Sequence, residues 1–162
     1  MRCVVSDTGP LLHLVEAQAL HLLRQVGDLH VPPQVVAEMT YRLSAWQAPG
    51  WITIDALAAS HAAEATAWQQ AGLLDAGEAE AIALACQLRA NWFLTDDAAA
   101  RLFATELGLE THGSLGVVLW AAAVGLLDHS QADHTLTRLA ASSLWISNKV
   151  LAEARSALGA MF

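Results

Sequence analysis

The sequence predicts an α/β fold, a three-layer α/β/α sandwich with a mainly parallel central sheet. Two observations predict it. Short apolar runs typical of buried strands alternate with longer segments of helical periodicity, and two of those runs end directly in aspartates. Strands that alternate with helices imply parallel strands joined by crossover helices, which then cover both faces of the sheet.

The first half of the chain begins with a short β-leaning run at 3–5. Ser6-Asp7-Thr8-Gly9-Pro10 follows, where capping residues and a proline suited to the first helical turn announce a helix. Gly27 ends the apolar repeat of that helix, Pro32-Pro33 opens the next one, and Pro49-Gly50 breaks the chain again. The expected elements are one helix at 11–26, a helix at 34–43, a strand at 51–54 and an alanine-rich helix to about residue 71.

The second half repeats the alternation. A strongly helical pattern at 77–88 precedes a buried-strand candidate at 92–95, which Asp96-Asp97 closes. Gly108 should stop the following helix, and Gly113-Ser114 should open another one. The expected elements are a helix at 98–107, a strand at 109–111, a helix from 113 to about 124, and helices at 131–141 and 147–158, the last capped by Ser147.

Length and composition indicate one domain over residues 1–162, with 55% hydrophobic residues. No stretch of about 18 apolar residues could cross a bilayer, and Asp7 comes too soon for the apolar middle of a signal peptide. Cys3 and Cys86 show no CxxC spacing, which suits reduced thiols. We therefore expect a cytoplasmic protein with no membrane partner.

The formal charge of −8, with only eight Lys and Arg residues, argues against a protein that coats nucleic acid electrostatically. An enzyme that meets phosphate through bound divalent cations tolerates an acidic pocket, because the cations invert the local sign of the charge.

Four acids are candidates for such a pocket. Asp7 and Asp97 follow strands, and ligands of open parallel sheets bind beyond the carboxyl ends of the strands. Glu38 and Glu78 lie near the starts of helices that can face the same crevice. Hard cations prefer carboxylate oxygens, so acids without paired thiols or imidazoles indicate Mg²⁺ or Mn²⁺. Helix capping is the alternative role for either aspartate.

Glu78 is preferred over Glu80 as the site residue of its helix. At about 100° per residue, Ala81, Ile82 and Ala85 fall on the side of Glu78, while Glu80 points nearer Ala83. A carboxylate on an apolar stripe is costly unless it is paired or bound to a cation. A first-turn acid that complements the helix dipole is the alternative for both.

The seven histidines show no HExxH or comparable spacing, so most are expected to be surface or packing residues. His112 is the exception by location, because it precedes Gly113-Ser114, where free backbone N–H groups could receive a phosphate. An ordinary loop histidine remains the alternative.

Several segments together resemble the PIN domain, in the right order and over nearly the whole chain. They are Ser6-Asp7-Thr8-Gly9-Pro10-Leu11-Leu12, the run Gly77-Glu78-Ala79-Glu80-Ala81-Ile82-Ala83-Leu84-Ala85, Leu94-Thr95-Asp96-Asp97 and Gly113-Ser114-Leu115-Gly116-Val117. The resemblance is closest to PIN-like proteins of uncharacterised function near the VapC toxins. It implies an α/β/α sandwich, a metal-dependent ribonuclease site of three or four acids, and often a homodimer.

By matching motifs, the resemblance makes Asp7 the first acid, Glu78 the helix acid, and Asp97 the strand-end acid with Asp96 beside it. Glu38 corresponds to the second acid through a short motif. Two departures stand out: many relatives carry Asp at the position of Glu78, and many are rich in Lys and Arg near the crevice. Here only Arg101 and Arg42 are obvious candidates for that role.

The function expected is that of a Mg²⁺- or Mn²⁺-dependent endoribonuclease, with the toxin of a toxin-antitoxin pair as one form of it. Asp7, Glu38, Glu78 and Asp97 would be catalytic and would bind metal together with Asp96, and RNA would be the substrate. Substrate-binding candidates are Thr8, Arg101 and Ser114. The expected partners are an antitoxin protein and a second copy in a homodimer.

Three other functions are alternatives to this one. A PIN fold without useful catalysis could bind a protein or nucleic-acid partner, which the acidic charge favours. A phosphotransfer receiver would need a lysine near the phosphate, and Lys149 lies far along the chain. A dinucleotide-binding protein would need a GxGxxG after the first strand, which the sequence lacks.

Overall fold

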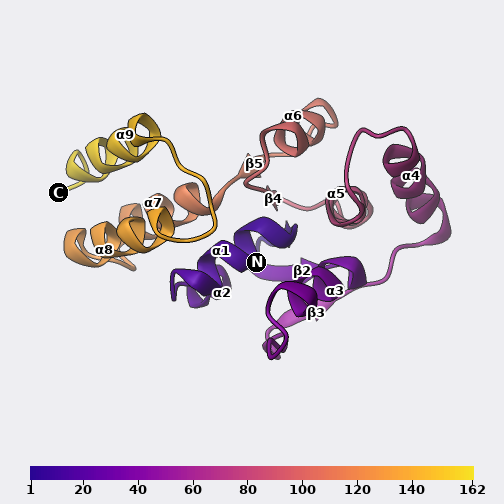
Figure 1. Cartoon of the computed structure of the whole chain (residues 1–162), viewed down its shortest axis with the longest axis horizontal. Coiled ribbons are helices and arrows are strands. Elements are labelled where there is room, and N and C mark those ends of the chain that lie inside the picture. Colours follow the sequence, from indigo (N-terminus) through magenta and orange to yellow (C-terminus); the bar gives the residue numbers. More distant parts are fainter.

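A computed structural model describes all residues, 1–162, and confirms the predicted fold. Five parallel strands form one sheet in the order β3-β2-β1-β4-β5 (Figure 1). The strands are β1 (Cys3–Ser6), β2 (Asp28–Val31), β3 (Ile52–Ile54), β4 (Trp92–Leu94) and β5 (Thr111–His112). The helices are α1 (Thr8–Glu16), α2 (His21–Val26), α3 (Pro33–Arg42), α4 (Ala59–Gln70), α5 (Ala76–Leu88), α6 (Ala98–Glu106), α7 (Ser114–Ala123), α8 (His129–Ala140) and α9 (Asn148–Gly159).

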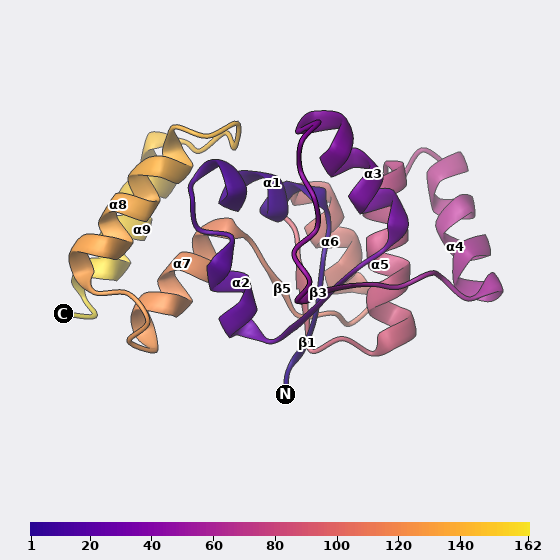
Figure 2. The same cartoon turned by 90° about the horizontal axis from the view of Figure 1, so that it is seen from below.

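The helices form a layer on each side of the sheet (Figure 2). One layer contains α1, α2 and α7, with α8 and α9 packed outside α7. The other contains α5, which packs on β1 and β4, and α6, with α4 outside α5. Helix α3 contacts both α1 and α5. The helical hairpin of α8 and α9 therefore lies at one end of the molecule and α4 at the other (Figure 1).

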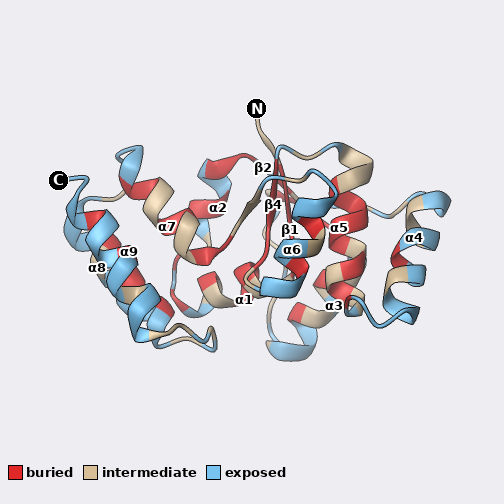
Figure 3. Ribbon diagram, turned by 90° about the horizontal axis from the view of Figure 1, so that it is seen from above, coloured by how far each residue is buried: buried red, intermediate tan, exposed pale blue.

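Strand β1 lies at the centre of the sheet. Val4 pairs with Leu29 of β2 on one side and with Trp92 of β4 on the other, and Val5 and Phe93 are fully buried. Helices cover both faces of such a strand, which explains its uninterrupted apolar sequence. The alanines of α5 serve the same core, since Ala79, Ala81, Ala83 and Ala85 are fully buried. Most of α5 is buried (Figure 3), and the small side chains let this helix approach both the sheet and α4.

The single helix predicted at 11–26 is wrong, because the chain turns between α1 and α2. Gln18 adopts a left-handed conformation with φ of 57°. The Ala19 N–H donates to the Leu14 carbonyl at 2.8 Å and the Gln18 N–H to the Val15 carbonyl at 3.0 Å. These two bonds form a Schellman motif, which usually carries glycine at the left-handed position. The apolar repeat continued across the turn because Ala19 and Leu22 are also buried.

Smaller differences concern element ends. Strand β2 begins at Asp28 and pairs with β1 over three residue pairs, and the sequence carried no clear signal for it. Strand β5 is displaced to Thr111–His112. Helix α8 begins two residues before the predicted start, because Asp128 and Gln131 form a capping box. The predicted cap of α9 is confirmed, since the Ser147 side chain accepts a hydrogen bond from the Val150 N–H. No helix combines the length and the hydropathy needed to cross a membrane.

Candidate active site

The candidate site lies where the chain changes direction across the sheet. From β1 the chain proceeds to β2 and β3 on one side, and from β4 it proceeds to β5 on the other. Ligands of open parallel sheets bind at the carboxyl ends of strands at this switch point. Asp7 follows β1, Asp96 and Asp97 follow β4, and the Asp7 N–H donates to the Leu94 carbonyl at 3.0 Å. The backbone itself thus holds the two acidic turns together.

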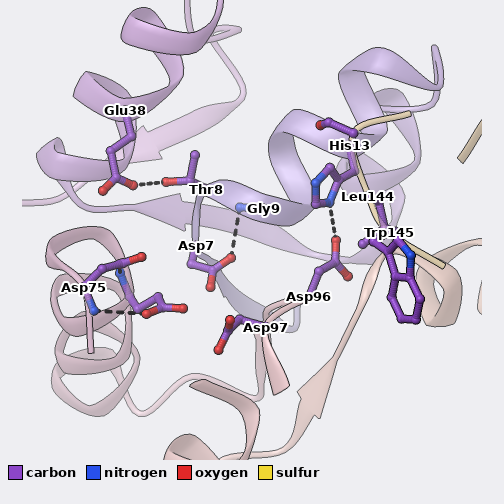
Figure 4. Close-up of a pocket in the computed structure, with 12 residues that line it drawn as sticks. Asp7, Thr8, Gly9, His13, Glu38, Asp75, Asp96, Asp97, Leu144 and Trp145 are labelled. Carbon is purple, nitrogen blue, oxygen red and sulfur yellow. Dashed lines mark hydrogen bonds and ion pairs between the residues drawn. The ribbon is translucent and has the colours of Figure 1, made fainter. Parts of the chain in front are cut away.

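A cavity of about 250 Å³ opens at this point (Figure 4). Half of its lining residues are carboxylates, one is a histidine, and none is lysine or arginine. The lining residues are Asp7, Thr8, Gly9, His13, Glu38, Asp75, Glu78, Asp96, Asp97, Ser143, Leu144 and Trp145. So many acids without a cationic side chain among them attract cations.

Asp7 is the most deeply buried of these acids, with 4% of its surface exposed. As N-cap of α1 it accepts a hydrogen bond from the Gly9 N–H at 3.2 Å, and its other oxygen accepts one from the Thr95 hydroxyl at 2.6 Å. Burial raises the pKa of Asp7 well above its usual range, and the Asp96 and Glu78 carboxylates add to the rise against these two bonds. Asp7 has no basic partner, so its charge is left uncompensated.

Asp96 has the opposite electrostatic environment. Its carboxylate contacts His13 Nδ1 at 2.7 Å, accepts from the Ser114 N–H at 2.7 Å and accepts from the Ser114 hydroxyl at 2.5 Å. Burial opposes ionisation of Asp96, but the hydrogen bonds from His13 and Ser114 outweigh it and lower its pKa below 3.8. Adjacent acids whose pKa values are pushed apart are typical of functional sites.

Glu38 reaches the cavity from α3. Its carboxylate accepts hydrogen bonds from the Thr8 hydroxyl and, at 3.1 Å, from the Gly77 N–H at the start of α5. A methyl group at position 77 would overlap the Glu38 carboxylate, so the close approach requires glycine there. These contacts tie α3 to the first turns of α1 and α5, two of the elements that bring acids to the cavity.

Glu78 enters through a capping box at the start of α5. Asp75 accepts from the Glu78 N–H at 2.8 Å, and the Glu78 side chain accepts from the Asp75 N–H at 3.0 Å. Burial raises the pKa of Glu78 to about 7, with the charges of Asp75 and Asp97 contributing. Glu80 lies outside the cavity and accepts from the Gln34 N–H at 3.2 Å.

Glu78 lines the cavity and Glu80 does not, in agreement with the preference for Glu78. The reason given for that preference, an apolar stripe on the Glu78 side of the helix, was incomplete. Ala83, on the side assigned to Glu80, is as fully buried as Ala81. The helix is covered all round, so an apolar stripe does not separate its two sides.

Asp97 completes the set as N-cap of α6. Its carboxylate accepts from the Ala100 N–H at 2.8 Å, and its own N–H donates to the Thr95 hydroxyl at 3.2 Å. The Thr95 hydroxyl therefore touches both strand-end acids, Asp7 and Asp97. Asp7 and Asp97 both cap helices, which was the alternative to a role in the site, and both also line the cavity.

A comparison of the whole chain with family models decides its family. The model described as a PIN domain matches residues 3–160. The chain belongs to the PIN-domain family. The PIN domain is a nuclease-type fold, and its members generally use divalent metals. No curated protein matches the chain.

The donor set of this PIN domain suits Mg²⁺ or Mn²⁺. All the acids of the cavity offer oxygen ligands, and the buried, uncompensated carboxylate of Asp7 is the kind of group that a hard cation stabilises. No three of these side chains converge as a ready-made ligand set. Each carboxylate is instead held by hydrogen bonds from its neighbours, as Glu38 is by Thr8 and Gly77.

The structure brings most of the predicted site residues of the PIN domain together. Asp7, Thr8, Glu38, Glu78, Asp96 and Asp97 all line the cavity. Ser114 is fully buried, with its hydroxyl on Asp96, and the Arg101 guanidinium donates to the Thr95 carbonyl at 3.2 Å outside the cavity. Substrate binding by these two residues stays a prediction. His112 contacts Glu110 at 2.9 Å and packs on Trp92, also outside the cavity.

Sequence reasoning missed three contributions. His13 stands four residues after Gly9 in α1, which places both on one side of that helix. Asp75 had a signal in the D-x-x-E spacing of its capping box with Glu78. The segment Ser143 to Trp145, which joins α8 to α9, had none, because it reaches the cavity only through the packing of the C-terminal hairpin.

Proposed function

We propose that this PIN domain is a Mg²⁺- or Mn²⁺-dependent ribonuclease that hydrolyses phosphodiester bonds in single-stranded RNA. The observation that carries the proposal is Asp7: a carboxylate at the switch point of the sheet, buried without a basic partner among five other acids. An arrangement that costs stability in the free protein is typical of a site that is completed by a ligand.

Asp7, Glu38, Glu78 and Asp97 are the residues that would hold the cation. When bound, Mg²⁺ or Mn²⁺ supplies an activated water and stabilises negative charge on the phosphate. The chain positions these acids through hydrogen bonds to two threonine hydroxyls. The Thr95 hydroxyl donates to the Asp7 carboxylate and accepts from the Asp97 N–H, and the Thr8 hydroxyl donates to the Glu38 carboxylate. Asp96 also lines the cavity, but both of its carboxylate oxygens already form hydrogen bonds with His13 and Ser114. We therefore assign Asp96 chiefly to holding His13 and Ser114 in place beside the site, and less to binding the cation.

The acidic cavity sets a condition on substrate binding. None of its lining residues is a lysine or an arginine, so a phosphate can approach only after cations have neutralised the carboxylates. Arg42 lines an adjoining cavity, and Arg101 lines another cavity together with Asp96. These two are the guanidinium groups available to a strand that runs across the site.

The direct test is cleavage of a mixed panel of labelled RNAs by the purified chain. We expect slow cleavage of single-stranded RNA with Mg²⁺ or Mn²⁺, complete loss on addition of EDTA, and loss in Asp7→Asn. Glu80→Gln is the matched control, because it removes a carboxylate of the same helix outside the cavity. A panel that stays intact at high protein concentration contradicts the catalytic proposal.

A second candidate function is supported by charge. With a net charge of −8 and carboxylates already hydrogen-bonded by the chain itself, the fold could act as a module that binds a partner without cleaving it. RNA that is bound and left intact would favour this candidate.

Two further parts of the proposal concern context, and both are supported by the resemblance to toxin relatives. We assign the protein a cytoplasmic role as the toxin of a toxin-antitoxin pair, acting as a homodimer. Light scattering on the purified chain tests the dimer. Co-expression with the product of a small neighbouring gene, followed by loss of RNA cleavage, tests the antitoxin.

A further inference from the structure

Three aromatic side chains of this protein are largely exposed: Tyr41 at 89%, Trp145 at 84% and Phe162 at 63%. Scattered exposed apolar residues are ordinary in soluble proteins. Tyr41 and Trp145 differ from such scattered residues, because each lines a cavity at the acidic site.

Trp145 lines the acidic cavity itself. In Figure 4 it lies beside Asp96, with Glu38 on the far side of Asp7. The loop that carries Trp145 is anchored to Glu16 at the end of α1: the Ser143 N–H donates to the Glu16 carboxylate at 3.1 Å, and the Ser143 hydroxyl donates to the same carboxylate. The exposed ring is therefore presented from a fixed backbone.

Tyr41 borders a second cavity of about 460 Å³, which shares five lining residues with the first: Thr8, Gly9, His13, Glu38 and Asp75. Glu38, Tyr41 and Arg42 stand at positions i, i+3 and i+4 of α3, on one face of the helix. Glu38 points into the acidic cavity, so Tyr41 and Arg42 lie one turn further from it on the same face.

From these positions we infer that Tyr41 and Trp145 stack unpaired nucleobases of a single strand on the two sides of the acidic cavity, with Arg42 meeting a phosphate beside Tyr41. The inference rests on the proposed function and names the substrate contacts of that site. Stacking on aromatic rings accepts any base, because every base has a π-face, and it requires a strand whose bases are free.

The charge of the protein favours a contact of this kind. Nonspecific nucleic-acid binding normally comes from many Lys and Arg side chains, and this chain has eight in all. Stacking is a contact between uncharged groups, so it can hold a strand against a protein with a net charge of −8. Bases held on both sides also place the intervening phosphate at the carboxylates.

Binding can be tested without cleavage by measuring fluorescence anisotropy of a short labelled RNA whose linkages resist hydrolysis, with Mg²⁺ present and with wild-type protein as the parent of every variant. We expect Tyr41→Ala and Trp145→Ala each to weaken the affinity between about 5-fold and 100-fold, as loss of one base stack does. Tyr41→Phe and Trp145→Phe should retain most of the affinity because they keep a ring.

Phe162→Ala is the matched control, since it removes an exposed aromatic ring at the C-terminus. Figure 2 shows that end of the α8 and α9 hairpin opposite the loop that carries Trp145. An abasic scan of the RNA should reveal sensitive positions on both sides of the cleaved bond, and those positions should become insensitive in the corresponding alanine variant. Single-stranded DNA should bind through the same two rings, and duplex RNA should not.

The inference is overturned if both alanine variants bind like the wild-type parent, if abasic positions have no effect, or if the parent binds no single strand. Its failure is separable from that of the proposed function. Normal cleavage by wild-type protein with unaffected alanine variants removes the stacking role alone, whereas ring-dependent binding without cleavage removes the nuclease and keeps the stacking role.

Discussion

Replacement of Glu78 by glutamine should stabilise the metal-free protein in a pH-dependent way. Glutamine keeps the side-chain oxygen that accepts from the Asp75 N–H, so the capping box survives while the charge is removed. Because burial raises the pKa of Glu78 from 4.5 to about 7, the folded state holds a proton that the unfolded state releases over this interval. Ionisation of Glu78 therefore costs stability as pH rises from about 4.5 to about 7.

The size of the effect follows from the same shift. Without solvent screening, a rise in the pKa of Glu78 from 4.5 to about 7 would lower the free energy of unfolding by roughly 3 kcal/mol above pH 7, at about 1.36 kcal/mol per pKa unit. Glu78 is only half-buried, so solvent screening reduces this to roughly 1–2 kcal/mol. For a chain of this length the gain in Glu78→Gln corresponds to a rise in Tm of roughly 3–6 °C above pH 7.

Urea unfolding in EDTA at a series of pH values from 4 to 8 measures this directly. The difference in unfolding free energy between Glu78→Gln and wild type should be small near pH 4, grow through pH 4.5 to 7, and level off above it. Glu80→Gln reports the effect of removing a carboxylate of the same helix outside the cavity. A difference that is constant across the series would refute the electrostatic account of Glu78.

Three further predictions concern the neighbouring residues. Asp7→Asn should raise the free energy of unfolding by about 0.5–2 kcal/mol at pH 7, because the raised pKa of Asp7 means that its charge destabilises the fold. Urea melts should show this gain shrinking as the pH falls toward about 4 and absent below it, where the carboxyl is protonated in both states. Gly77→Ala should keep a Tm within a few degrees of wild type, because the group displaced is the end of a flexible side chain, but should lose most Mn²⁺ affinity as Glu38 is pushed from the cavity; unchanged metal affinity would show that Glu38 is not a ligand. Glu78→Gln should reduce Mn²⁺ affinity and RNA cleavage where Glu80→Gln does not, and the reverse outcome would show that the wrong side of α5 was assigned to the site.

Features encoded within a few residues were predictable from the sequence. Asp7 and Asp97 follow apolar strands directly, and parallel strands end at the same edge of a sheet, so their meeting followed from the alternation of strands and helices. Helix ends with ordinary signals, such as the Ser147 cap of α9, were also predictable.

Features that depend on distant contacts were not predictable in this way. Asp96 and Ser114 are 18 residues apart, and they meet because β5 pairs with β4, which brings the start of α7 close to the end of β4. The loop carrying Trp145 reaches the cavity from the C-terminal hairpin. The turn at Gln18 was not predicted for two reasons. A residue other than glycine adopts the left-handed conformation there, and buried apolar residues continue on both sides of the turn.

The most direct test of the central claim is isothermal titration calorimetry with Mn²⁺, comparing wild type with Asp7→Asn, Asp97→Asn and the Glu80→Gln control. If the acidic cavity is a metal site, wild type and Glu80→Gln should bind Mn²⁺ alike, and both asparagine variants should bind it at least about 10-fold more weakly. Equal Mn²⁺ affinity in all four proteins, with all four folded by thermal melting, would contradict it.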